Sequence, residues 1–310
     1  MKTDRRNFLL SGSAVMAATA TGMLVNSSTS AAATTGNASQ TVDISWLGGA
    51  TMLIDFDGHR ILTDPTFGEG EQAYFMADPN EMFDLAKGPN ARDHARTTPF
   101  PGLDLSSVDL MIISHMHEDH FDQLAEKSLP KSLRTIVPTN DAENLAGKGF
   151  QNQMIMDWGQ STTITTKNGQ ITVTVIPAHH SPNPQVNAML GKGNGYWLTF
   201  ETGDWRKDIY WTGDTFPTDE VMAAVKTHGI PDILIPHMGA VGTTGPLGQI
   251  SMGAEQVLQM ADTLGQPNIL PIHHSTYPLY LEPVSRLIEQ TDFAQTRIDL
   301  IAEGSTIAYS

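Results

Sequence analysis

Short apolar runs recur along residues 41–310, and Gly, Pro, Asp and Asn separate them, a pattern that predicts many short strands with some helices. The pairs Asp57-Gly58 and Asn168-Gly169 favour tight turns, so each predicts a hairpin between its flanking runs. We expect strands at 41–46, 51–56, 59–63, 108–113, 135–137, 162–166, 170–176, 196–201, 208–211, 233–235, 269–272, 298–301 and 305–309.

Helical patterns fall between these strands, and residues 67–101 follow neither pattern. We expect helices at 122–129, 142–148, 219–228, 253–264 and 282–290. Residues 67–101 have no clear period and hold many turn-forming residues, which predicts a long functional loop. Strand-rich and strand–helix regions alternate twice, so we expect two similar halves, each a sheet with helices on its outer face. Two such sheets packed face to face give an α/β fold, a four-layer αββα sandwich.

The N-terminal residues differ from the rest of the chain. Thr3-Asp4-Arg5-Arg6 and the Phe8-Leu9 that follows resemble the twin-arginine export signal, with Asp4 as a departure. The next stretch is too short and too poor in Leu and Ile to span a bilayer, which takes about 20 apolar residues. We therefore expect a signal peptide at 1–33, a flexible leader at 34–40 and one domain at 41–310. The expected location is periplasmic or secreted, with no stable membrane insertion.

The amino-acid composition excludes several classes of function. The chain has 0 Cys, which excludes disulfide frameworks, zinc fingers, catalytic thiols and iron–sulfur clusters. Any metal must therefore take nitrogen and oxygen ligands, which suit Zn, Mn or Fe(II). The net charge of −16, from 18 Lys+Arg against 34 Asp+Glu, repels phosphate backbones and argues against nucleic acid as a partner.

The densest chemical signal is the run Ser114-His115-Met116-His117-Glu118-Asp119-His120, directly after the apolar run 108–113. Imidazole nitrogens and carboxylate oxygens are zinc ligands, at about 2.0–2.2 Å. Packing these imidazoles and carboxylates together without a cation would leave buried charge and polarity uncompensated. We therefore expect a metal site here.

Three later apolar runs also end in candidate ligands. They lead to His179-His180, to Asp214 and to His273-His274. Because α/β sheets usually build their sites in the loops at strand ends, we expect these side chains to join the first cluster. His237 also follows an apolar run, and both a pocket and a core position suit it.

The pattern His115-x-His117-x-Asp119-His120, followed by Gly213-Asp214-Thr215 and a C-terminal His pair, resembles the metallo-β-lactamase superfamily. The resemblance extends over nearly all of residues 41–310. It also includes three further motifs: Trp46-Leu47-Gly48-Gly49-Ala50-Thr51, Ile61-Leu62-Thr63-Asp64-Pro65 and Pro271-Ile272-His273-His274. The most similar branch is that of ascorbate-6-phosphate lactonase and N-acyl phosphatidylethanolamine phospholipase D.

The resemblance implies the αββα fold and two divalent ions, with Zn expected and Mn or Fe as alternatives. It assigns the ligands as His115, His117 and His180 for one ion, Asp119, His120 and His273 for the other, and Asp214 between them with a hydroxide. In this branch the first of the later ligands follows Pro-x-x, which selects His180, and the last follows an apolar pair, which selects His273. It also implies that Asp64 holds a ligand imidazole, and that His179 and His274 support the site or line the pocket. We expect His237 in the same role, although it departs from the branch.

The implied reaction is hydrolysis of a small-molecule ester, lactone or phosphodiester, with Asp119 and Asp214 as catalytic carboxylates. A β-lactamase-like amide hydrolase and a non-catalytic periplasmic binding module for metal or ligand are the alternatives. His117 argues against a flavodiiron oxygen reductase, which would carry a carboxylate at that position. Gly49, Ser251 and His237 depart from the branch and leave the substrate open.

Overall fold

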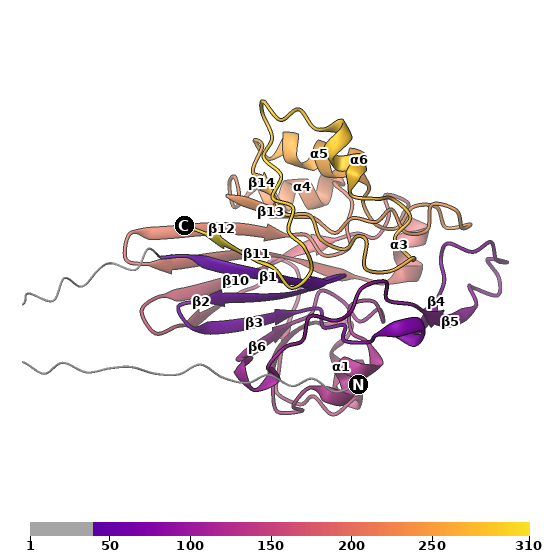
Figure 1. Cartoon of the computed structure of the whole chain (residues 1–310), viewed down its shortest axis with the longest axis horizontal. Coiled ribbons are helices and arrows are strands. Elements are labelled where there is room, and N and C mark those ends of the chain that lie inside the picture. Colours follow the sequence, from indigo (N-terminus) through magenta and orange to yellow (C-terminus); the bar gives the residue numbers. More distant parts are fainter. Residues whose placement is uncertain (1–39) are drawn as a thin grey trace, which may run out of the picture. The chain divides into compact units, whose positions relative to one another are not determined.

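The computed structural model describes residues 40–310, which form two main β-sheets with helices on their outer faces (Figure 1). The predicted signal peptide at 1–33, and the predicted leader apart from Gln40, lie outside the described residues. None of the helices that the structure describes is both long enough and apolar enough to span a bilayer.

The first sheet has seven strands in the order β15-β1-β2-β3-β6-β7-β8. Its β15, β1, β2 and β3 pair antiparallel, whereas β3, β6, β7 and β8 pair parallel. The strands are β1 (Val42–Gly48), β2 (Thr51–Phe56), β3 (His59–Thr63), β6 (Leu110–Ile112), β7 (Arg134–Pro138), β8 (Gln153–Met156) and β15 (Thr306–Tyr309).

The second sheet has six strands in the order β14-β13-β12-β11-β10-β9. Its β9 to β12 pair antiparallel and its β12 to β14 pair parallel, so each sheet has an antiparallel and a parallel part. The strands are β9 (Ser161–Thr165), β10 (Gln170–Ala178), β11 (Gly193–Thr202), β12 (Trp205–Trp211), β13 (Ile233–Ile235) and β14 (Asn268–Ile269).

Three apolar layers join the sheets and helices. Phe56 of the first sheet packs against Phe200 and Trp205 of the second, with ring centroids 5.3 and 5.7 Å away, within the core between the sheets. A second cluster joins the outer face of the second sheet to α4 (Asp219–Lys226), α5 (Ala254–Thr263) and α6 (Ser285–Gln290). A third joins the first sheet to α1 (Gln123–Ser128) and α2 (Ala142–Gly147). The predicted αββα sandwich is confirmed (Figure 1).

Residues 67–101 are not one irregular loop, as the sequence predicted. They contain the 3₁₀ turn η1 (Gly70–Gln72) and the hairpin of β4 (Tyr74–Ala77) and β5 (Ala91–His94), and a second 3₁₀ turn, η2 (Leu105–Ser107), follows. These four-residue strands lack apolar alternation. The hairpin depends instead on packing, because Tyr74 stacks on its partner His94 and meets Tyr277 edge-on at 5.0 Å. The sequence also missed β8 and α3 (Pro184–Leu190).

The C-terminal elements are shorter than predicted. The strand expected at 269–272 ends at Ile269, and Ile298 forms only a single bridge to it rather than a strand at 298–301. Pro271 has no N–H for a sheet and interrupts the ladder, which resumes only as a single bridge between Ile272 and His237. The helix expected from 282 begins at Ser285, because the Glu282 carboxylate instead accepts from the Ala254 N–H at the start of α5, at 2.6 Å.

Candidate metal centre

The candidate ligands and the residues beside them come from the carboxyl ends of six strands, β3 and β6 of the first sheet and β10, β12, β13 and β14 of the second. Two groups of side chains each have their potential ligand atoms within 4.8 Å of one another. The residues that follow these strands are Asp64 (β3), His115, His117, Asp119 and His120 (β6), His180 (β10), Asp214 (β12), His237 (β13) and His273 (β14).

A tight turn after β6 gathers three of the histidines. The backbone N–H groups of His120 and Phe121 both donate to the His117 carbonyl, at 2.9 Å each. The His115 ring centroid consequently lies 4.4 Å from that of His117 and 4.0 Å from that of His120. His115 of one group therefore lies beside His120 of the other, so the two groups are adjacent.

Backbone turns also aim the later ligands. Gly213 has φ of 58°, and a Cβ there would lie 2.5 Å from the Asn194 carbonyl oxygen, so glycine is needed for the turn that presents Asp214. His273 has φ of 61°, which is rare for a residue with a side chain. Its N–H donates to the Gly49 carbonyl at 2.9 Å, which ties this strained turn to the β1–β2 connection.

The first group consists of His115, His117 and His180. The Nε2 of His115 lies 2.9 Å from Nδ1 of His117 and 3.1 Å from Nε2 of His180. Burial lowers the pKa of His115 well below its usual value, lowers that of His117, and brings that of His180 to about 3. Three neutral imidazoles therefore converge at neutral pH, which is the protonation state that a metal requires.

Asp64 and Ser114 orient the imidazoles of the turn. The Ser114 hydroxyl donates to Asp64 Oδ2 at 2.5 Å, so its oxygen can accept from the Nδ1–H of His115 at 3.0 Å. Nδ1 of His120 lies 2.8 Å from the same carboxylate oxygen and donates to it. Both histidines then carry their proton on Nδ1, and both present the Nε2 lone pair to the centre.

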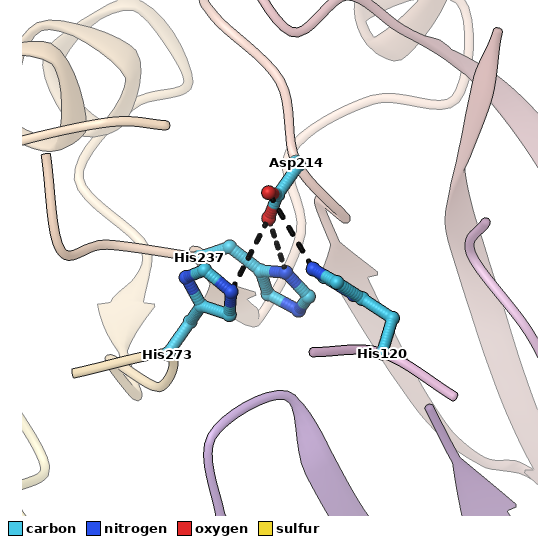
Figure 2. A group of neighbouring side chains, drawn as sticks. All are labelled: His120, Asp214, His237 and His273. Atoms are coloured by element: carbon cyan, nitrogen blue, oxygen red, sulfur yellow. Dashed lines mark hydrogen bonds and ion pairs between the residues drawn. The ribbon is translucent and has the colours of Figure 1, made fainter. Parts of the chain in front are cut away.

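The second group consists of His120, Asp214, His237 and His273 (Figure 2). Asp119 lies beside this group. His120 Nε2 lies 3.4 Å from Asp214 Oδ2, and His273 Nε2 lies 3.4 Å from Asp119 Oδ2 and 3.8 Å from Asp214 Oδ1. Nδ1 of His273 donates to the Met238 carbonyl at 2.8 Å, which leaves its Nε2 lone pair directed at the two carboxylates.

The carboxylates of this group are ionised and attract positive charge. Burial alone would raise the pKa of Asp214, but His273 and His120 outweigh it and hold that pKa well below its usual value. Burial likewise opposes charge on His120, yet Asp214 and Asp119 raise its pKa well above the usual value, so a positive charge, either a proton or a metal ion, is favoured at its Nε2. The pKa of Asp119 falls to about 2, since His120 and His273 outweigh its burial.

The residues fit a pair of divalent cations. The Nε2 atoms of His120 and His273 are buried and have no hydrogen-bond partner among the described residues. Such atoms are costly to bury unless something occupies them. A metal ion between the imidazole lone pairs and the ionised carboxylates would satisfy both at once.

His237 has both of its nitrogens engaged by protein groups. The indole N–H of Trp211 donates to Nε2 of His237 at 2.7 Å, and an indole nitrogen can only donate. The proton of the neutral His237 imidazole must then lie on Nδ1, which donates to Asp214 Oδ1 at 2.9 Å (Figure 2). His237 thus orients the Asp214 carboxylate and has no free lone pair for a metal.

The structure separates the members of each histidine pair. His180 is buried against His115, whereas His179 faces Glu220 of α4, with Nε2 3.1 Å from its carboxylate. His273 faces Asp119, whereas His274 packs on Trp46 with ring centroids 4.6 Å apart. Only His180 and His273 therefore point into the centre.

Sequence reasoning assigned no role to Ser114 or Trp211, although both hold the centre together. Ser114 lies directly before His115, so its place in the cluster was a usable signal. Trp211 ends β12 and is completely buried, which by itself indicates only a core residue. Its part in the site depends on β13 lying next to β12.

A cavity of about 240 Å³ opens onto His117, Asp119, His180 and Asp214. Its remaining walls are mostly apolar and come from the β4–β5 loop, the end of α3 and the segment 241–250. A substrate can therefore reach both groups of candidate ligands from one side.

Residues 59–274 match the family model of the beta-lactamase superfamily domain. A Mycobacterium tuberculosis protein of uncharacterised function is 28% identical over 257 residues, which are 79% of this chain and 63% of that protein. The chain thus matches less than two thirds of that relative's length. The N-acyl-phosphatidylethanolamine-hydrolyzing phospholipase D 1 of Caenorhabditis elegans is 24% identical over 261 residues, covering 80% of this chain and 69% of the enzyme.

Solved structures share the fold. A possible metal-dependent hydrolase of Veillonella parvula aligns with a TM-score of 0.67 and 22% identity, over 86% of this chain and 98% of the other. An isothiocyanate hydrolase from Delia radicum gut bacteria aligns with a TM-score of 0.66 and 23% identity, over 86% and 99%. With the family model matching more than half of its length, this chain belongs to the beta-lactamase superfamily.

Proposed function

We propose that the protein is a binuclear metal-dependent hydrolase acting on a small-molecule ester, lactone or phosphodiester. The first ion would be held by His115, His117 and His180 at the first group. The second ion would be held by Asp119, His120 and His273, and Asp214 would serve both ions. Zn is the expected metal, with Mn and Fe as alternatives that this set of nitrogen and oxygen ligands also suits.

One observation carries the proposal. Imidazole lone pairs and ionised carboxylates from separate strand ends converge on one cavity, and two of the buried nitrogens have no other partner among the described residues. A sandwich of this size has an adequate apolar core without a structural metal, so the centre is functional rather than structural.

Two divalent ions at this centre would supply a hydroxide nucleophile at neutral pH and would polarise the carbonyl or phosphoryl oxygen under attack. The protein's own side chains orient the groups that would hold the ions. Asp64 and Ser114 hold the imidazoles in one tautomer, and His237 holds Asp214. The ionised Asp119 lines the cavity, where its carboxylate can accept a hydrogen bond from an attacking water and orient it.

The test is metal content combined with turnover. The purified protein, loaded with Zn or Mn, is assayed for metal per chain and for hydrolysis of a carboxylic ester, a lactone, a phosphodiester and a chromogenic β-lactam. We expect two metals per chain and hydrolysis within the first three classes. Asp214→Ala should abolish that hydrolysis.

The adjacent histidines provide matched variants. His180→Ala should lose one metal per chain, whereas His179→Ala should keep two, because His179 faces Glu220 outside the centre. Preferred hydrolysis of the β-lactam would favour an amide hydrolase. Two bound metals without turnover would favour a binding module, and fewer than one metal per chain after loading would refute the centre itself.

A further inference from the structure

We propose that the cavity beside the metal centre binds the apolar acyl group of an uncharged carboxylic ester, so that the protein selects such esters over phosphodiesters. This rests on the proposed hydrolase function and narrows its substrate class. The walls of the cavity, its charges and its rim all favour such a ligand.

Apart from Glu118, the cavity walls outside the centre are mostly apolar. Three separate segments supply them: the β4–β5 hairpin with Met76 and Leu85, the end of α3 with Met189 and Leu190, and the segment 241–250 with Leu247 and Ile250. The volume of about 240 Å³ is just below the roughly 300–1,000 Å³ of drug-sized sites. An acyl chain of modest length fits such a space.

No cation lines the cavity among the described residues, and its charged side chains are Glu118, Asp119 and Asp214. Neither Arg92 nor Lys87 of the β4–β5 hairpin lines the cavity. Arg92 pairs with Asp78 and Glu81, at 3.6 and 2.5 Å. The Lys87 side chain is 82% exposed, 4.0 Å from Asp84.

The cavity offers little to attract an anion, because its lining, in the part of the chain that the structure describes, includes acidic side chains but neither Lys nor Arg. A phosphodiester remains anionic at neutral pH and would find no side-chain cation to pair with in the cavity. A carboxylic ester is uncharged and needs none.

The rim of the cavity continues the apolar surface. Leu85 and Met189 both line the cavity, yet their exposed fractions are 59% and 60%. Exposed apolar side chains gathered at a cavity mouth are typical of a ligand site, because a bound apolar group removes them from water. An acyl chain that extends from the centre toward the rim would cover both.

The experiment uses the metal-loaded full-length protein and two matched substrate series. One series is the p-nitrophenyl esters from acetate to octanoate, and the other is the alkyl p-nitrophenyl phosphates from methyl to hexyl. We expect kcat/KM for the esters to rise about fourfold per methylene until the cavity is filled, which corresponds to about 0.8 kcal/mol. The KM of the hexyl phosphodiester should exceed that of the hexanoate ester about tenfold or more, since its charge has no partner.

A charge-introducing variant tests the same point within the protein. Met189→Arg should flatten the dependence on ester chain length and narrow the KM gap between the two series. The control is Ile155→Arg, which adds the same charge at a residue of β8 that is 53% exposed and lies outside the cavity lining. It should change neither result, and both variants should retain two metals per chain.

Each outcome decides the matter. An ester series without chain-length dependence, or a phosphodiester KM equal to or below that of the ester, overturns the inference and leaves the hydrolase proposal standing. Failure of the metal-loaded protein to hydrolyse either series overturns this inference, and the hydrolase proposal falls with it if the lactone is not hydrolysed either.

Discussion

Replacing His237 by Phe tests whether this residue orients Asp214 or is itself a metal ligand. Phe keeps a planar ring that can still stack on His273, whose ring centroid is 5.0 Å away at an interplanar angle of 6°. It removes the contacts of His237 with Asp214 and with Trp211. The perturbation is thus confined to two hydrogen bonds.

The expected magnitudes follow from those bonds. The indole N–H of Trp211 would be left buried and unpartnered, at a cost of about 1–3 kcal/mol in the free energy of unfolding. Asp214 would lose the donor that holds its Oδ1 in place. Loss of such a supporting hydrogen bond typically lowers metal affinity by about 10–100-fold, so we expect that change with two metals still bound at saturation.

Competition with a chromophoric chelator measures the affinity, and elemental analysis after saturation measures the stoichiometry. The visible spectrum of the Co²⁺-substituted protein adds a readout that general destabilisation would not move, because it reports the ligand arrangement around the metal. Trp211→Phe is the matched variant: it removes the indole donor but leaves the His237–Asp214 bond, so its affinity should fall less than that of His237→Phe.

Two results would refute this reasoning. A saturated stoichiometry of one metal in His237→Phe would make His237 a ligand. An unchanged metal affinity and Co²⁺ spectrum would mean that the hydrogen bond to Asp214 has no bearing on the centre.

Three further predictions concern stability and export. Burial raises the pKa of Asp141 to about 6, above its usual 3.8, so the folded state binds this proton more tightly and stability falls as pH rises from about 4 to 6. Asp141→Asn should therefore stabilise the protein by about 2 kcal/mol at pH 7.5 and by much less at pH 4.5, and equal gains in urea unfolding at both would contradict this. Phe56→Ala should cost about 3–5 kcal/mol of stability, because it opens a cavity between the sheets, while metal stoichiometry stays unchanged; a thermal-unfolding shift below a few degrees would count against this packing. Replacing Arg5 and Arg6 together by Lys should retain the protein in the cytoplasm on cell fractionation, and unaltered export would rule out the twin-arginine route.

The sandwich and most of its strands could be predicted from the sequence because their signals are local. The hairpin turn at Asn168-Gly169 and the apolar run that ends before His115 depend on neighbouring residues only. The β4–β5 hairpin could not be predicted, because its strands lack alternation and it is held by Tyr74 packing on Tyr277. The strand expected at 298–301 reduced to one bridge, since an apolar run alone does not secure a partner.

The sequence by itself also determined which kinds of side chain reach the centre, because the candidate ligands follow strand-forming runs. Tertiary structure alone decided where each side chain points. His237 belongs to the same cluster as His273, and only the indole of Trp211 on the neighbouring strand commits it to holding Asp214. The apolar cavity likewise needs three segments that lie far apart in the chain. Local sequence patterns indicate which residue types lie at the centre. The direction of each lone pair and the shape of the cavity depend instead on long-range packing, which no local pattern contains.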